Sequence, residues 1–119
     1  MKNFVQDGRI LTLTPPVGGV VSGQAYQIED LIVVATVTVT AAEALAGAQF
    51  EAFVGPGVVT LPKADGETWT EGEKVYWDDG DGVVTTDSDT GSNPLIGVAV
   101  AAAASDDATG TVRLDGVAR

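Results

Sequence analysis

EGEKVYWDDGDGVVTT, residues 71–86, is the stretch of sequence that decides the fold. Val75 and Trp77 alternate with polar residues at the period of two that is typical of a β-strand. Residues 79–82 are Asp and Gly, which tolerate positive φ, and a β-branched run begins at Val83. The pattern therefore predicts a β-hairpin with a short loop and one apolar face. An aromatic side chain buries roughly 150–250 Å², so Trp77 and the nearby Trp69 are expected to lie in the core.

Short β-branched or alternating segments occupy most of the remaining chain, separated by Gly and Pro. The segment Gly55 to Gly57 predicts a tight turn between two strands, and helix-forming composition is confined to 41–46, which is too short for more than a single turn. The fold class is therefore predicted to be all-β: a small single-domain β-barrel or β-sandwich of about 8–10 short strands with little helix. The strands are expected at 9–14, 24–28, 31–40, 49–54, 58–61, 74–78, 83–86, 95–104 and 111–115.

Composition excludes several function classes. The chain has 119 residues, enough for one domain with a modest core. It has neither Cys nor His, so disulfides, thiolate chemistry, imidazole bases and the commonest zinc ligands are absent. Six basic residues face seventeen acidic ones, a formal charge of −11. Such a charge repels a phosphate backbone, so we expect no nucleic-acid partner.

The acidic loops are the main candidates for chemistry. Carboxylates crowd into residues 78–81 and 87–89, and calcium prefers oxygen ligands, but the spacing lacks the third ligand and the final glutamate of an EF-hand. Solvated turns are the preferred interpretation, so no catalytic, metal or cofactor site is predicted. The alternative is a small carbohydrate-binding module or a carboxylate-based enzyme, in which Trp69, Tyr76 and Trp77 would form a sugar platform.

Six segments, in order and spacing, resemble the small capsid cement (decoration) proteins of tailed bacteriophages. They are KNFVQDG (2–8), LTPPVGGVVSG (13–23), VVTLPKA (58–64), EGEKVYWD (71–78), IGVA (96–99) and VRL (112–114). The family usually has Thr-Ala-Pro at 14–16 and a glycine near Val34, where this chain differs. Its members are sometimes labelled predicted RecA/RadA-type phage recombinases, but this chain has no phosphate-binding loop and the wrong charge for DNA.

The resemblance implies a protein that binds the outer surface of the assembled head and stabilises contacts between major-capsid subunits. Residues 1–23 are expected to be an N-terminal arm and first strand that contact the capsid, and 24–119 the body of the single domain. The arm pairs cationic with apolar side chains, and the expected capsid contacts are Lys2, Asn3, Phe4, Val5, Gln6 and Arg9. The expected contacts between subunits of a homotrimer are Gly97, Val98, Ala99, Val100 and Ala101.

The resemblance also implies a location. The expected place is the virion, on the capsid exterior, after synthesis in the bacterial host cytoplasm, because residues 1–7 lack the apolar core of a secretory signal. No membrane partner is expected, since the longest apolar run, 98–104, is far shorter than the roughly 20 residues of a membrane helix.

Overall fold

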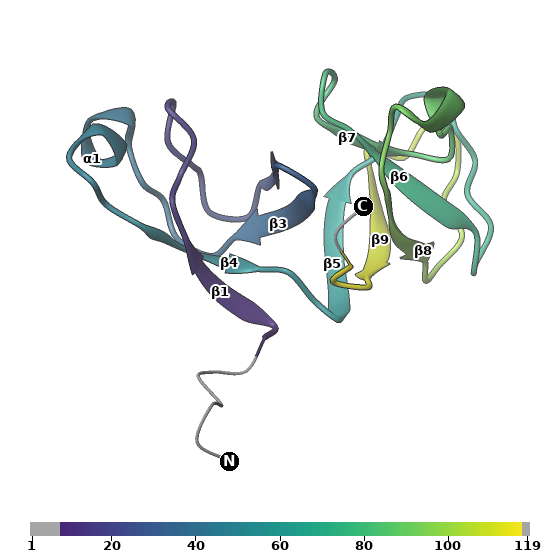
Figure 1. Ribbon diagram of the computed structural model, residues 1–119. Helices are drawn as coiled ribbons and strands as arrows, with labels where there is room; N and C mark the ends of the chain where they lie inside the picture. Colours follow the sequence, from purple (N-terminus) through teal and green to yellow (C-terminus); the bar gives the residue numbers. More distant parts are fainter. Residues whose placement is uncertain (1–7, 118–119) are drawn as a thin grey trace, which may run out of the picture.

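The computed structural model describes residues 8–117, and in this range the chain forms two antiparallel sheets (Figure 1). The four-stranded sheet has the order β1-β4-β3-β2, and the five-stranded sheet has the order β5-β9-β8-β6-β7. One short helix and one 3-10 turn accompany them, so the all-β prediction is confirmed. The elements are β1 (Ile10–Leu13), β2 (Ala25–Ile28), β3 (Leu31–Ala35), α1 (Ala41–Leu45), β4 (Phe50–Phe53), β5 (Gly57–Pro62), β6 (Lys74–Asp78), β7 (Val83–Thr85), η1 (Asp89–Gly91), β8 (Leu95–Ala99) and β9 (Thr109–Leu114).

The predicted hairpin is confirmed as β6 and β7. These strands pair antiparallel, with Trp77 opposite Val84. Val75 and Trp77 are 0% and 3% exposed, so the apolar face of the alternating pattern lies in the core. Trp69 is equally buried and belongs to the same cluster. The aromatic side chains of this stretch are thus the centre of the larger core.

Two glycines allow the five-stranded sheet to pack as it does. A Cβ on Gly97 of β8 would lie 1.9 Å from the carbonyl oxygen of Arg113 in β9. A Cβ on Gly110 of β9 would lie 2.1 Å from Cζ3 of Trp69. Real Cβ contacts are never this close, so any side chain at these positions would push strand from strand, or strand from indole.

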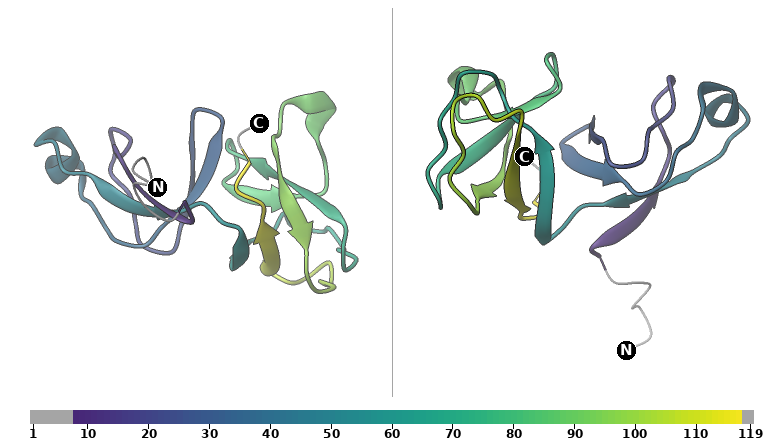
Figure 2. Two further views of the ribbon diagram at one scale, coloured as in Figure 1. Left: turned by 60° about the horizontal axis from the view of Figure 1, so that its bottom comes forward. Right: turned by 180° about the vertical axis from the view of Figure 1, so that it is seen from behind.

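Strand β3 connects the two sheets because it is buried on both faces. Val33 and Ala35 belong to the core of the four-stranded sheet, whereas Ile32 and Val34 belong to the core cluster centred on the five-stranded sheet. This accounts for the uninterrupted apolar run at this point in the sequence. The two sheets sit side by side in both further views (Figure 2), joined by β3 packing and by the segment between β4 and β5.

The architecture is sandwich-like, without a closed barrel. The outer strands of the five-stranded sheet meet only at an isolated parallel bridge between Lys63 and Val84. The turn at Gly55 to Gly57 lies between two strands, as predicted, but these strands belong to different sheets. The turn is therefore a corner between sheets and not the tip of a hairpin.

Two predicted strands are shorter than expected. The segment 31–40 stops being a strand at Ala35, because Thr36 to Thr38 are exposed and Val39 pairs separately with Val20. The segment 95–104 stops at Ala99, because its continuation changes partner and Ala103 pairs with Trp69. In both cases β-propensity continues but the neighbouring strand does not, and pairing decides the strand end.

The short helix α1 is close to the single turn that was predicted. It begins with a capping box, in which the Thr40 hydroxyl accepts from the Glu43 N–H at 3.2 Å and Glu43 Oε1 accepts from the Thr40 N–H at 2.9 Å. These two bonds satisfy backbone donors that a helix start leaves free. They stabilise a five-residue helix that propensity alone would not maintain.

Candidate binding surface

The acidic loops stabilise turns and do not form a metal site. Asp78 Oδ1 accepts from the Asp81 N–H at 3.2 Å, and Asp79 Oδ1 accepts from the Trp77 indole N–H at 3.0 Å. Over residues 8–117 no group of three or more carboxylates is arranged to hold a metal ion. In the same range no helix has the length and apolar character of a membrane span.

The tryptophans do not form a sugar platform. Trp69 is 1% and Trp77 3% exposed, so neither ring presents a face on which a sugar could stack. Their indole N–H groups donate to Glu67 and Asp79, at 3.2 and 3.0 Å. Buried indoles with paired N–H groups are typical of core residues, which agrees with the preferred interpretation of the sequence.

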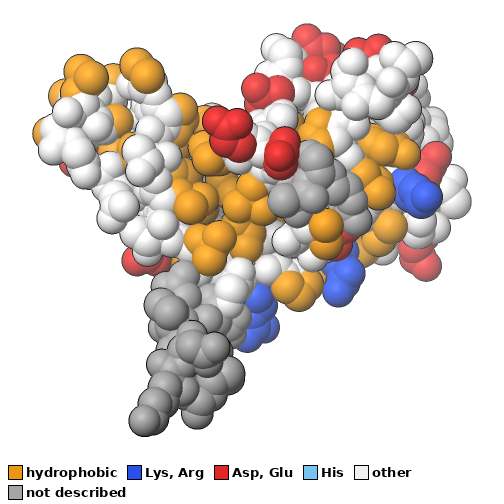
Figure 3. Space-filling model, viewed as in Figure 1, with side chains coloured by type: hydrophobic (Ala, Val, Ile, Leu, Met, Phe, Trp, Pro, Cys, Tyr) orange, Lys and Arg blue, Asp and Glu red, His pale blue; other side chains and the backbone are white. Residues whose placement is uncertain are grey.

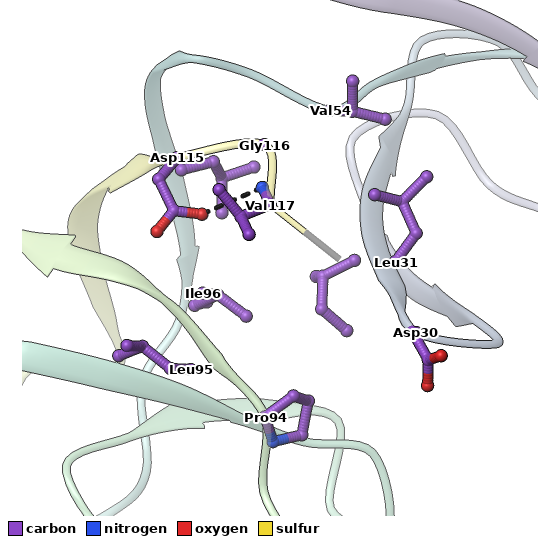
Figure 4. A pocket seen from close by; sticks show the side chains of 11 residues that line it. Asp30, Leu31, Val54, Pro94, Leu95, Ile96, Asp115, Gly116 and Val117 are labelled. Atoms are coloured by element: carbon purple, nitrogen blue, oxygen red, sulfur yellow. Dashed lines mark hydrogen bonds between the residues drawn. The ribbon is translucent and has the colours of Figure 1, made fainter. Parts of the chain in front are cut away.

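A crevice follows the junction of the two sheets (Figure 4). Asp30 and Leu31 come from the four-stranded side, and Ile96 and Asp115 from the five-stranded side. Asp115 Oδ1 accepts from the Val117 N–H at 3.1 Å. The space left between these walls is about 10 Å³, the lower limit for one water molecule. The crevice is therefore a packed junction with no room for an organic ligand.

A buried polar network closes one end of the five-stranded sheet. Lys63 is 2% exposed, and its ammonium donates to the carbonyl oxygens of Ala64 and Glu67 at 3.0 and 2.6 Å. The Glu67 carboxylate accepts from the Trp69 indole at 3.2 Å, from the Thr86 N–H at 2.9 Å and from the Thr85 hydroxyl. Among the described residues no buried side-chain polar atom lacks a partner. The network thus holds the structure together, and all of its known contacts are internal.

Charge is distributed unevenly along the chain. Residues 1–54 contain five acidic and two basic residues, a net −3, and residues 55–119 contain twelve acidic and four basic residues, a net −8, which together give the −11 of the whole chain. On the face in Figure 3, Asp and Glu side chains gather at the upper rim of the half that carries the five-stranded sheet. Most Lys and Arg side chains lie lower on this face, with hydrophobic side chains between them.

The basic side chains follow from the sheet register. Val58 of β5 is opposite Arg113 of β9, Arg113 is opposite Val98 of β8, and Val98 is opposite Lys74 of β6. Val58, Arg113 and Lys74 are exposed and Val98 is half-buried, so all four point to the outer face of the sheet. We call Val58, Arg113, Val98 and Lys74 the cationic row. It has no acidic member.

An apolar hollow lies at the corner between the two sheets, and its walls reach β5. It is lined by Arg9, Ile10, Phe53, Pro56 and Gly57. Ile10 is 46% exposed. Gly57 directly precedes Val58 in β5, so the hollow adjoins the cationic row.

A second, uncharged apolar surface lies at the tips of the four-stranded half. Val17 in the β1–β2 loop is 84% exposed, and Leu45 in α1 is 81% exposed. Hydrophobic side chains are visible at these tips in Figure 3. The structure does not show what covers them.

The residues predicted to contact the capsid or a second subunit lie in several places. Lys2, Asn3, Phe4, Val5 and Gln6 lie outside the described residues, and Arg9 is exposed immediately before β1. Gly97 and Ala99 are buried within the sheet, Val98 and Val100 are half-buried, and Ala101 is exposed. The sequence alone did not identify the cationic row, although the alternation in each strand indicates which side chains point outward. What was missing was the order of the strands.

The comparisons with known proteins agree with the fold and with the absence of a ligand site. No curated protein and no solved structure matches the chain. A family model described as phage cement protein matches residues 5–114, nearly the whole sequence. The chain therefore belongs to the phage cement protein family.

Proposed function

We propose that this protein binds the outer surface of the assembled phage head and stabilises the contacts between neighbouring major-capsid subunits. The observation that carries the proposal is the family match over residues 5–114. The mechanism is binding alone, with no bond made or broken. Contacts that exist only in the assembled, expanded lattice stabilise that lattice by mass action, as does any ligand selective for one state.

The structure supports a role without catalysis. The crevice between the sheets has no room for a substrate, and the carboxylates at the β6–β7 loop hold turns. The protein would reside in the virion, on the capsid exterior, after synthesis in the host cytoplasm. The acidic rim would then face solvent, where its charge keeps particles apart.

Co-sedimentation with heads that lack the protein tests this function. The expected result is saturable binding to expanded heads, with little binding to unexpanded ones. Absence of binding to expanded heads, or retention of the protein on a carbohydrate affinity column in its place, would contradict the proposal.

The proposed oligomer is a homotrimer, at least on the capsid. Cyclic symmetry lets three identical patches meet a matching lattice site. In the segment 97–101, Val98, Val100 and Ala101 are the residues with side chains available for a subunit contact, because Gly97 and Ala99 are buried inside the chain. Equilibrium sedimentation of the free protein and the copy arrangement in a virion map are the checks. Monomers in both would contradict the trimer.

The N-terminal arm is proposed to be a capsid anchor. Within residues 1–23 the structure places Ile10–Leu13 in the four-stranded sheet and buries Val20, so the proposal now concerns chiefly the residues before Ile10. Deletion of residues 1–7 is the test. We expect a folded protein with weakened binding to heads, whereas unfolding or unchanged binding would contradict the anchor.

A further inference from the structure

The cationic row is the feature of the surface that the proposed function does not yet use. It lies across four adjacent strands, β5, β9, β8 and β6. Neighbouring strands are about 4.8 Å apart. The Cα atoms of Arg113 and Lys74, two strands apart, are therefore separated by roughly 10 Å. Valine side chains lie beside and between these two cations.

Charges in this row are available to a partner. Neither Lys74 nor Arg113 forms an ion pair with another residue of the described part of the chain. Exposed charges contribute little to folding stability, so the fold does not account for their position. Of the six basic residues, Lys63 is buried, and Lys2 and Arg119 lie outside the described residues. Two of the remaining three lie in this one row.

The chemistry of the row selects one kind of partner. The molecule carries a formal charge of −11, so most of its surface repels an acidic protein surface. The row is a place where carboxylates on another protein could approach without like-charge repulsion. Val58, 58% exposed, adds apolar area between the row and the hollow at the sheet corner. Mixed arginine and apolar contacts are typical of protein interfaces.

We propose that the cationic row is the surface that docks on the capsid, and that its partner is a patch of the major capsid protein that carries carboxylates next to apolar side chains. This inference rests on the proposed function. It adds which face of the protein turns toward the capsid and what chemistry meets it.

The test compares two double variants of equal net charge. Lys74→Gln with Arg113→Gln removes both cations of the row. The matched control, Ser92→Asp with Ser105→Asp, makes the same change in net charge at two exposed loop positions outside the row. Binding to expanded heads free of the protein is measured by co-sedimentation at several sodium chloride concentrations. Circular dichroism and thermal melting confirm that both variants are folded.

We expect the Gln variant to bind with a Kd raised about tenfold or more, and the control to bind within about threefold of the original protein. The binding of the original protein should weaken as salt rises, and that of the Gln variant should depend much less on salt. If the original protein binds and the Gln variant binds equally well, the docking surface is wrong while the proposed function remains. If the original protein does not bind heads, the proposed function itself fails.

Two further outcomes would overturn the inference. Equal weakening of both variants would show that net charge, and not the row, governs binding. Sedimentation of the free protein addresses the second case, because Val98 belongs both to the row and to the segment proposed as a subunit contact. If the Gln variant loses self-association that the original protein has, the row joins copies of this chain and does not dock on the capsid.

Discussion

Substitution of Glu67 by Ala should destabilise the fold strongly, because one carboxylate serves three donors. The Trp69 indole, the Thr86 N–H and the Thr85 hydroxyl all donate to it. Trp69 and Thr85 are 1% and 5% exposed, so their donors would be left without water or protein partners. A hydrogen bond to a charged group contributes about 1.5–3 kcal/mol, and such values do not add fully. We expect a loss of about 3 kcal/mol in the free energy of unfolding.

Equilibrium urea unfolding, followed by tryptophan fluorescence, measures this loss. A decrease of about 3 kcal/mol lowers Tm by roughly 10 °C for a domain of this size. Glu67→Gln keeps the shape and one acceptor oxygen, so it should cost about 1 kcal/mol. Glu71→Ala is the matched control, since Glu71 is exposed and outside the network, and it should stay within about 0.5 kcal/mol of the original protein. A cost below about 1 kcal/mol for Glu67→Ala would refute the reasoning.

Three further predictions concern other parts of the chain. Gly97→Ala should destabilise by more than about 3 kcal/mol or prevent folding, since its Cβ would lie 1.9 Å from the Arg113 carbonyl oxygen; normal urea unfolding of this variant would contradict the close approach. The hydrogen bond from the Thr40 backbone N–H, followed by that of the Thr40 side chain, holds the pKa of Glu43 below its ordinary value of 4.5. The ionised form is thus favoured by folding, and the contribution of Glu43 to stability is full above pH 4.5 and lost as the pH falls through the lowered folded-state pKa. A carboxyl titration by NMR that gives Glu43 a pKa of 4.5 or higher would be the contrary result. Addition of EDTA should leave Tm unchanged, since no described cluster of carboxylates can hold a metal ion; a fall in Tm would indicate a bound cation.

The sequence predicted the parts of the fold that depend on local pattern. The β6–β7 hairpin was predictable because alternation at 74–78 and the Asp-Gly loop specify the same structure independently. The ends of β3 and β8 were not, because Val37 and Val100 favour a strand but have no continuing partner strand. Propensity describes one segment, and pairing describes two.

The binding surface was less predictable, for a related reason. Lys74 and Arg113 are far apart in the sequence, and only the order β9-β8-β6 brings them into one row. The burial of Gly97 and Ala99 likewise follows from β8 lying inside the sheet with a neighbour on each side. Small residues in a strand indicate close packing, but they do not indicate whether the close neighbour is the same chain or another copy.

Thermal disruption of expanded heads, measured by scanning calorimetry with and without saturating protein, tests the cement function most directly. A ligand that binds only the assembled lattice must raise its disruption temperature, and the rise must grow with protein concentration. We predict such a concentration-dependent rise for the original protein and a smaller one for Lys74→Gln with Arg113→Gln at the same concentration. Binding to the heads without any rise in disruption temperature would contradict a stabilising role for this protein.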